Sequence, residues 1–229
     1  MSDTISLPLF PLNTVLFPNQ LLPLHIFEER YKLMIGECIQ NKAPFGVVLI
    51  RAGREAGGPS VPFEVGTTAR IADVQYLPQG RMNLRAVGEQ RFRLERVTQQ
   101  RPYMRGDATV LEAPAAANAA ASLIDNIKRG FSTHLDILAQ LSEQERVAVN
   151  MDVTPEHLSY LVAAILAIQN PEKQELLEMV STDERLQREA TILNRENRTL
   201  QTFLYLRKHG PAKKGPDDQG DLQSRISVN

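Results

Sequence analysis

Proline spacing at the start of the chain limits the folds that it can adopt. Four prolines fall within the first 23 residues, at positions 8, 11, 18 and 23. A proline inside a helix removes a hydrogen bond and clashes with the preceding turn, so this density excludes a helix here. The apolar runs between the prolines, LPLF, TVLF and LLPLHIF, therefore predict edge or bulged strands, or irregular chain that crosses the mouth of a barrel.

The periodicity changes after this opening segment. Residues 27–40 carry apolar side chains on one stripe and charges on the other, which predicts an amphipathic helix. FGVVLI at 45–50 predicts a buried strand, and Pro78-Gln79-Gly80 predicts a turn. The long strand after that turn should bury one face and expose the other, with a bend or bulge at Gly88. Its predicted inner face holds Met82, Leu84, Ala86, Phe92 and Leu94.

The second half of the chain has the pattern of helices. Apolar stripes follow Pro114, and Thr154-Pro155-Glu156 and the pair Ser181 and Glu184 are typical of helix N-termini. Beyond residue 208, too few apolar side chains remain to offset the entropy of ordering the chain. The sequence therefore predicts an α+β protein with a β-rich part at 1–112, a helical part at 113–208 and a disordered tail at 209–229.

Composition and charge exclude several classes of protein. The single cysteine, Cys38, rules out an intrachain disulfide, and a net charge of −1 gives no overall field for nucleic acid or an anionic membrane. The first apolar residues follow no basic segment, unlike those of a signal peptide. The most apolar stretch, 161–168, is shorter than the roughly 20 residues that cross a bilayer. We therefore expect a cytoplasmic protein that does not bind membranes.

Four stretches carry a resemblance to a known family. They are LPLFPLNTVLFPNQLLPLHIFEERY, FEVGTTARI, LRAVGEQRFRLERV and NPEKQELLEMVSTDERLQRE. In this order they resemble the Lon protease N-terminal (substrate-binding) domain family. The resemblance implies a PUA-like pseudo-β-barrel, mostly antiparallel, followed by an α-helical bundle. In full-length Lon proteases this unit recognises unfolded or tagged substrates and contributes to assembly of the hexamer.

The chain also departs from those proteases. It has no G-x-x-x-x-G-K-[ST] loop to hold nucleotide phosphates, and we expect no room for a Ser-Lys peptidase domain. We therefore expect a stand-alone, non-enzymatic module without a cofactor. Its partners would be unfolded or partly unfolded polypeptide and, as an adaptor or regulator in protein quality control, a separate protease.

The titratable residues form no pattern for catalysis or metal binding. Histidines never lie four residues apart in the chain, and one cysteine cannot form a thiolate zinc site. Cys38 falls on the apolar stripe of the predicted helix, where a buried thiol is unreactive. We therefore predict neither a metal ligand nor a catalytic residue.

The opening segment is the candidate for polypeptide binding. Between positions 17 and 24 it is more apolar than an irregular segment needs to be, and an exposed apolar patch would hold an unfolded chain. The alternative is that these side chains fill the barrel. The candidate residues are Phe17, Pro18, Leu21, Leu22 and Leu24.

An arginine-rich strand supports an alternative hypothesis, RNA binding. Its arginines alternate with the apolar side chains and should share the outer face; they are Arg81, Arg85, Arg91 and Arg93. PUA-like folds include RNA binders, and guanidinium groups fit phosphates. Aromatic stacking partners are scarce on this face and the chain has no tryptophan, so we favour a solvated sheet face over a nucleic-acid site.

The last predicted helix carries a heptad pattern. Leu186, Leu193 and Leu200 recur every seven residues, and Asn197 and Leu204 each follow one of them by four. This spacing is typical of a coiled coil, in which Asn197 would fix the register. The pattern predicts either a homo-oligomer formed through this stripe or packing on the preceding helices.

Overall fold

The computed structural model describes residues 4–55, 60–112 and 119–209. The strands are β1 (Thr4–Leu12), β2 (Leu21–Ile26), β3 (Phe45–Gly53), β4 (Ser60–Tyr76), β5 (Met82–Gln99) and β6 (Met104–Val110). The helices are α1 (Glu29–Asn41), α2 (Ala121–Ser142), α3 (Pro155–Ile165), α4 (Asn170–Glu178) and α5 (Thr182–His209). The predicted tail lies outside the described residues, except for His209, which ends α5.

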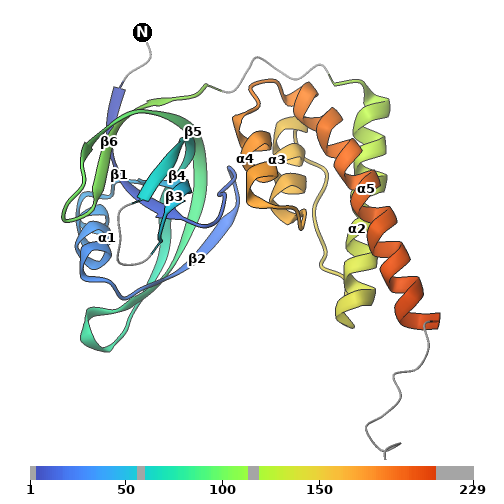
Figure 1. The fold of residues 1–229 in the computed structure, drawn as a ribbon, viewed down its shortest axis with the longest axis horizontal. Helices are drawn as coiled ribbons and strands as arrows, with labels where there is room; N and C mark the ends of the chain where they lie inside the picture. The colour runs from blue at the N-terminus through green and yellow to red at the C-terminus, as the bar shows by residue number, and fades with distance from the viewer. Residues whose placement is uncertain (1–3, 56–59, 113–118, 210–229) are drawn as a thin grey trace, which may run out of the picture.

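The strands form one mixed sheet that closes into a barrel (Figure 1). The order is β2-β5-β4-β3-β1-β6, and a further pairing between β5 and β6 closes the ring. β1 and β3 pair in parallel, and the other pairs are antiparallel. In the described part of the chain β2 pairs only with β5, so it is an edge strand outside the ring. This arrangement confirms the predicted, mostly antiparallel pseudo-barrel of an α+β protein.

Alternating side chains fill the barrel as the sequence predicts. The apolar face of β5 is buried, at Met82, Leu84, Ala86, Phe92 and Leu94. Helix α1 packs its apolar stripe on the same core, with Tyr31, Met34, Ile35 and Cys38 buried. Because α1 and the strands bury one face each, most of the charged side chains on their other faces remain in water.

The helical part is built around α2 and α5, which run side by side in the same direction (Figure 1). Their register is set near the middle by Asn197, which donates to the Gly130 oxygen at 2.8 Å, and near the ends by Arg207, which donates to the Leu141 oxygen at 2.6 Å. Two predicted caps are confirmed, since Thr154 and Ser181 accept from the main-chain N–H groups of His157 and Glu184. None of the described helices has the length and apolarity needed to cross a membrane.

The helices share an apolar core with four buried residues of the β part, and this core is separate from the two clusters inside the barrel. Val15, Phe17, Leu49 and Val65 of the β part pack in the same buried cluster as residues of α2, α3, α4 and α5. Gln174 of α4 donates to the Val65 oxygen at 2.9 Å. Strands give way to helices between Val110 and Ala121, as expected, but the division into separate parts at 112 and 113 stays a prediction.

Candidate functional site

The segment predicted to bind polypeptide is divided between the core and the surface. Phe17 is fully buried and its ring lies 6.4 Å from that of Tyr160 in α3, and Pro18 is also buried. Because they are buried, these two side chains do not belong to an exposed patch, and they follow the predicted alternative of side chains that fill the core. Leu22 and Leu24 are half-buried against the barrel core, whereas Leu21 is 53% exposed.

A tight turn sets where the exposed part of this segment begins. Gln20 donates its main-chain N–H to the Phe17 oxygen, with Pro18 and Asn19 at the two central positions and Asn19 at φ 64°. This is a type II turn, which favours proline and then a residue with positive φ. Gly88 of β5 bonds to both Asn19 and Gln20, so two residues of the opening segment oppose this one glycine. The bulge predicted in β5 is seen against β4, where the register shifts between Gly88 and Arg91. The turn releases the chain from the core into β2.

We call β2 together with Phe27 the edge surface. Leu21 and Phe27 are its most exposed apolar side chains, at 53% and 56%. The His25 ring stacks on Phe27 with centroids 5.9 Å apart, and its Nδ1 lies 2.7 Å from Asn83 Oδ1. A depression of about 430 Å³ beside the strand is lined by Pro23, Leu24, His25, Asp73, Gln75, Asn83, Leu84 and Arg85.

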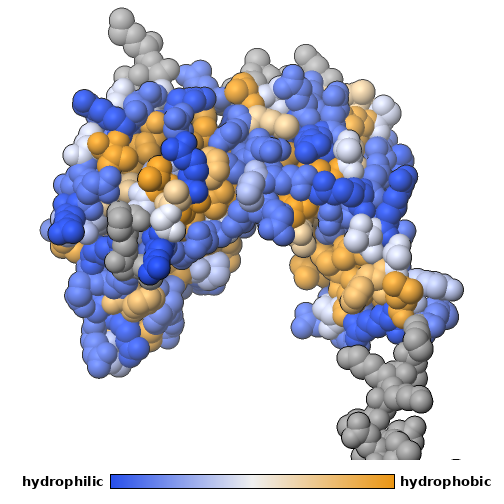
Figure 2. Space-filling model, in the orientation of Figure 1, coloured by the Kyte–Doolittle hydropathy of each residue, from blue (hydrophilic) through white to orange (hydrophobic). Residues whose placement is uncertain are grey.

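The edge surface borders a hollow in the molecule. The barrel and the paired helices α2 and α5 extend on opposite sides of this hollow, and β2 runs along the side of the barrel that faces it (Figures 1 and 2). Apolar side chains also gather toward the ends of α2 and α5 (Figure 2). The exposed ones in this region are Val147, Phe203 and Leu206.

The four arginines predicted on the outer face do not form a basic surface. Arg85 pairs with Asp73 at 3.0 Å, Arg93 pairs with Glu64 at 3.7 Å, and Arg81 donates to the Pro78 oxygen. Arg91, expected to face water, is only 3% exposed. It lies on the outer face of the barrel as predicted, but α4 covers that face at this point. With carboxylates or carbonyls beside all four, nothing in this geometry supports RNA binding.

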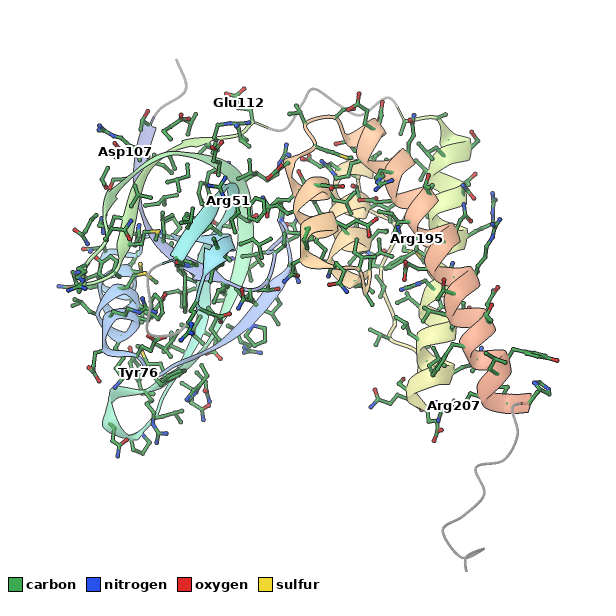
Figure 3. All side chains as sticks on the ribbon, viewed as in Figure 1. Arg51, Tyr76, Asp107, Glu112, Arg195 and Arg207 are labelled. Atoms are coloured by element: carbon green, nitrogen blue, oxygen red, sulfur yellow. The ribbon has the colours of Figure 1, made fainter. Side chains whose placement is uncertain are left out.

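The heptad stripe of α5 packs inside the molecule. Leu186 and Leu193 are buried in the shared core, and Asn197 is buried against α2, where its Oδ1 lies 2.8 Å from His134 Nδ1. These three side chains fit the predicted alternative, packing on the preceding helices, and a homo-oligomer through this stripe stays a prediction. Leu200 and Leu204 are half-buried. Beyond them, Arg207 lies at the far end of α5 (Figure 3).

A buried polar network lies where the helices meet the barrel, and the sequence pattern did not predict it. Arg185 donates from Nε to Ser159 Oγ at 2.6 Å, and Ser159 donates to Glu189 Oε1 at 2.8 Å. The Arg185 guanidinium lies 4.2 Å from the Tyr160 ring centroid and also donates to the Met179 oxygen. Arg185, Ser159 and Glu189 are fully buried, so the network stabilises the helices and has no route to a substrate.

The described residues give little support for a metal site or a cysteine nucleophile. Within them, His, Cys, Asp and Glu side chains form no group able to hold a metal ion. Burial raises the pKa of the Cys38 thiol to about 11, with smaller effects from Arg105 and Glu37. A thiol with that pKa is protonated at neutral pH and is a poor nucleophile.

Comparison with known proteins identifies the family. The model of the ATP-dependent protease La (LON) substrate-binding domain matches residues 6–195. The chain belongs to this family. Among curated relatives of this LON domain, it is 27% identical over 198 residues to Lon protease of Anaeromyxobacter dehalogenans and 28% identical over 198 residues to Lon protease 2 of Myxococcus xanthus. Each alignment covers 85% of this chain but 24% of the relative, so the chain spans about a quarter of these proteases.

Solved structures of LON domains have the same fold. The Lon N-terminal domain protein from Xanthomonas campestris superposes with a TM-score of 0.62 at 26% identity, over 80% of this chain and 96% of that one. The N-terminal domain of the Mycobacterium avium complex Lon protease gives a TM-score of 0.61 at 19% identity, over 83% and 98%. The domain matched in both is thus present almost whole in this chain.

Proposed function

We propose that this chain is a non-catalytic module that recognises unfolded or partly unfolded polypeptide through the edge surface. The supporting observation is that Leu21 and Phe27 stay exposed on an edge strand that borders the hollow. Covering such side chains with an apolar segment removes both from water and requires no bond-making step. Membership of a substrate-binding family supports the same assignment.

We further propose that the module works as an adaptor or regulator beside a separate protease, which would contact the helical part. Exposed Val147, Phe203 and Leu206 on that part support this role, because they are apolar and lie apart from the edge surface. We also propose that the protein is located in the cytoplasm. We expect a protease to co-purify with the tagged chain. The double variant Phe203→Glu, Leu206→Glu should lose this protease, and Phe27→Glu should keep it.

Binding of an unfolded polypeptide tests the main proposal. The anisotropy of a fluorescently labelled, permanently unfolded protein should rise to saturation as the chain is added. Leu21→Glu combined with Phe27→Glu should weaken this binding roughly tenfold or more, because a charge cannot be buried against an apolar segment without cost. Val61→Glu, at an exposed apolar site in β4, is the matched control and should bind as the wild type does.

Two results would count against the proposal. The first is no saturable binding with the chain at about 100 µM, a concentration at which even weak recognition is visible. The second is equal weakening by the edge-surface variant and the Val61 variant. Turnover of ATP or cleavage of the polypeptide by the purified chain would contradict the non-catalytic assignment.

A further inference from the structure

The outer side of β2 offers main-chain groups that no described strand uses. β2 pairs with β5 over Leu21–Ile26, antiparallel and in continuous register. Main-chain groups of consecutive residues in such a strand point alternately toward the partner strand and away from it. Half of the N–H and C=O groups of β2 therefore point away from β5, toward the hollow.

The bulge at Gly88 determines which residues these are. Gly88 donates its N–H to the Gln20 oxygen at 2.9 Å, so Gln20 is directed toward β5. Because the direction alternates along the strand, the main-chain N–H and C=O groups of Leu22, Leu24 and Ile26 also point toward β5. The outward residues are then Leu21, Pro23 and His25. Proline lacks an N–H, and at an outward position this absence breaks no hydrogen bond with β5.

We propose that the edge surface holds its ligand as an added β-strand, paired along the outer side of β2. This inference rests on the proposed polypeptide binding and specifies its mode. Leu21 and His25 each present an N–H and a C=O, and Pro23 presents a C=O, which together are complementary to the main chain of an extended segment. Main-chain pairing does not depend on the ligand's sequence, as a module for unfolded clients requires.

The exposed side chains define the class of segment that fits. Leu21, Pro23, His25 and Phe27 project from the same face because successive side chains of a strand alternate. Residues of an added strand on that face lie within about 5.5 Å of their cross-strand neighbours. Leu21 and Phe27 are six positions apart, about 20 Å along an extended chain. The preferred ligand is therefore an extended segment with apolar side chains at alternate positions.

A second copy of the chain is a poorer occupant of this edge. Two β2 strands that pair symmetrically about Pro23 would place the two prolines opposite each other. Neither proline could donate to the other, so both Pro23 oxygens would lose their hydrogen bonds at the centre of the contact. An unfolded client with an N–H at that position satisfies the Pro23 oxygen.

N-methylated peptides test this mode of binding. The parent is a labelled peptide of about nine residues, with leucine at alternate positions to cover the length of the edge. One isomer carries N-methyl groups on the leucines, and a matched isomer carries the same number on the intervening residues. In antiparallel addition the leucine N–H groups point to β2, so the first isomer should bind at least about tenfold more weakly and the second should bind like the parent.

The possible outcomes separate the inference from the proposed function. The opposite asymmetry would also support strand addition, in the parallel sense. If the parent binds and both isomers match it, or both lose binding equally, strand addition is wrong while polypeptide binding stands. If neither the parent nor an unfolded protein binds, the proposed function itself fails. A dimer in sedimentation that Pro23→Val strengthens would make a second copy the occupant and overturn the inference.

Discussion

Arg91 of β5 donates from Nη1 to the main-chain oxygen of Leu177 in α4, over 2.9 Å and across 86 positions of sequence. The same nitrogen lies 2.7 Å from the Met179 oxygen. Both carbonyls belong to the C-terminal end of α4, where the helix dipole favours a cation. The buried guanidinium of Arg91 thus joins the barrel to the C-terminal end of α4.

Replacing Arg91 should destabilise the whole molecule. Arg91→Met keeps most of the side-chain volume but leaves the buried Leu177 oxygen without its charged donor and the Met179 oxygen with Arg185 alone, which costs about 1–3 kcal/mol. Urea denaturation measures the change in the free energy of unfolding. Arg93→Met is the matched control, because Arg93 is exposed on the same strand and should change stability by less than about 0.5 kcal/mol. Equal effects of the two variants would contradict the role given to Arg91.

Gly88 should tolerate no side chain. A Cβ at this position would lie 2.3 Å from the Phe17 oxygen, which is main chain and cannot turn away. Gly88→Ala should therefore lower the free energy of unfolding by more than about 2 kcal/mol and displace the start of β2. Gly36→Ala in α1 is the control, since nothing lies within 4 Å of its Cβ. That change should stabilise the protein by up to about 1 kcal/mol in thermal denaturation.

Asn197 should matter through its contacts with α2. Asn197→Ala removes the hydrogen bonds to the Gly130 oxygen and to His134, and His134 Nε2 already lacks a partner in the described structure. A buried imidazole without partners costs about 1–3 kcal/mol, which chemical denaturation will detect. Asn194→Ala, exposed on the same helix, should have almost no effect. A smaller loss for Asn197 than for Asn194 would be incompatible with this packing.

Glu189 should make stability depend on pH. Burial raises the pKa of its carboxyl well above the ordinary value of 4.5, despite the opposing effects of the Ser159 hydrogen bond and of Arg185. Above pH 4.5 the folded state keeps a proton that the unfolded state releases, so the free energy of unfolding should fall as pH rises, by at most about 1.4 kcal/mol per unit. Below that pH the contribution is fully present.

The variant Glu189→Gln removes this titration and should flatten the profile. Urea denaturation at pH 5 and at pH 8 should give a smaller difference for Glu189→Gln than for the wild type. Glu184→Gln, on the exposed side of α5, should keep the wild-type difference. The opposite result is that Glu189→Gln lowers the free energy of unfolding, relative to the wild type, by more at pH 8 than at pH 5. That result would mean that the Glu189 carboxyl is charged in the folded state and acts as the partner of Arg185.

Pro23→Val should tighten binding of the apolar peptide. The substitution restores an outward N–H on β2, and one added hydrogen bond of about 1 kcal/mol corresponds to roughly fivefold in affinity. Peptide titration followed by anisotropy gives the dissociation constant. Pro62→Val in β4 is the control and should leave the affinity unchanged. Unchanged or weaker binding by the Pro23 variant would speak against pairing along this edge.

Local features of the fold follow from the sequence because they depend on neighbouring residues. The spacing of Met82, Leu84 and Ala86 requires one buried face whatever lies on it, and the amphipathic stripe at 27–40 requires a helix with one covered side. The Gly88 bulge was also predictable, since glycine alone permits so close an approach of main chain. The edge strand indicated by the prolines is confirmed for Pro23 in β2, but it is wrong for Pro8 and Pro11, since they lie in β1 and this strand pairs with both β3 and β6.

The candidate site is a different case, because exposure depends on what packs against a surface. Phe17 and Leu21 are both apolar and four positions apart, yet the helices cover the first and leave the second exposed. Arg91 and Arg93 lie on the same outer face, and only the one beneath α4 is buried. Leu186 and Leu193 show the heptad spacing of an intermolecular stripe but pack within the chain. The sequence alone determined which side chains share a face of a helix or strand. The tertiary structure decided which faces pack together. Those contacts join residues that are far apart in the sequence, so no periodic pattern in the sequence reveals them.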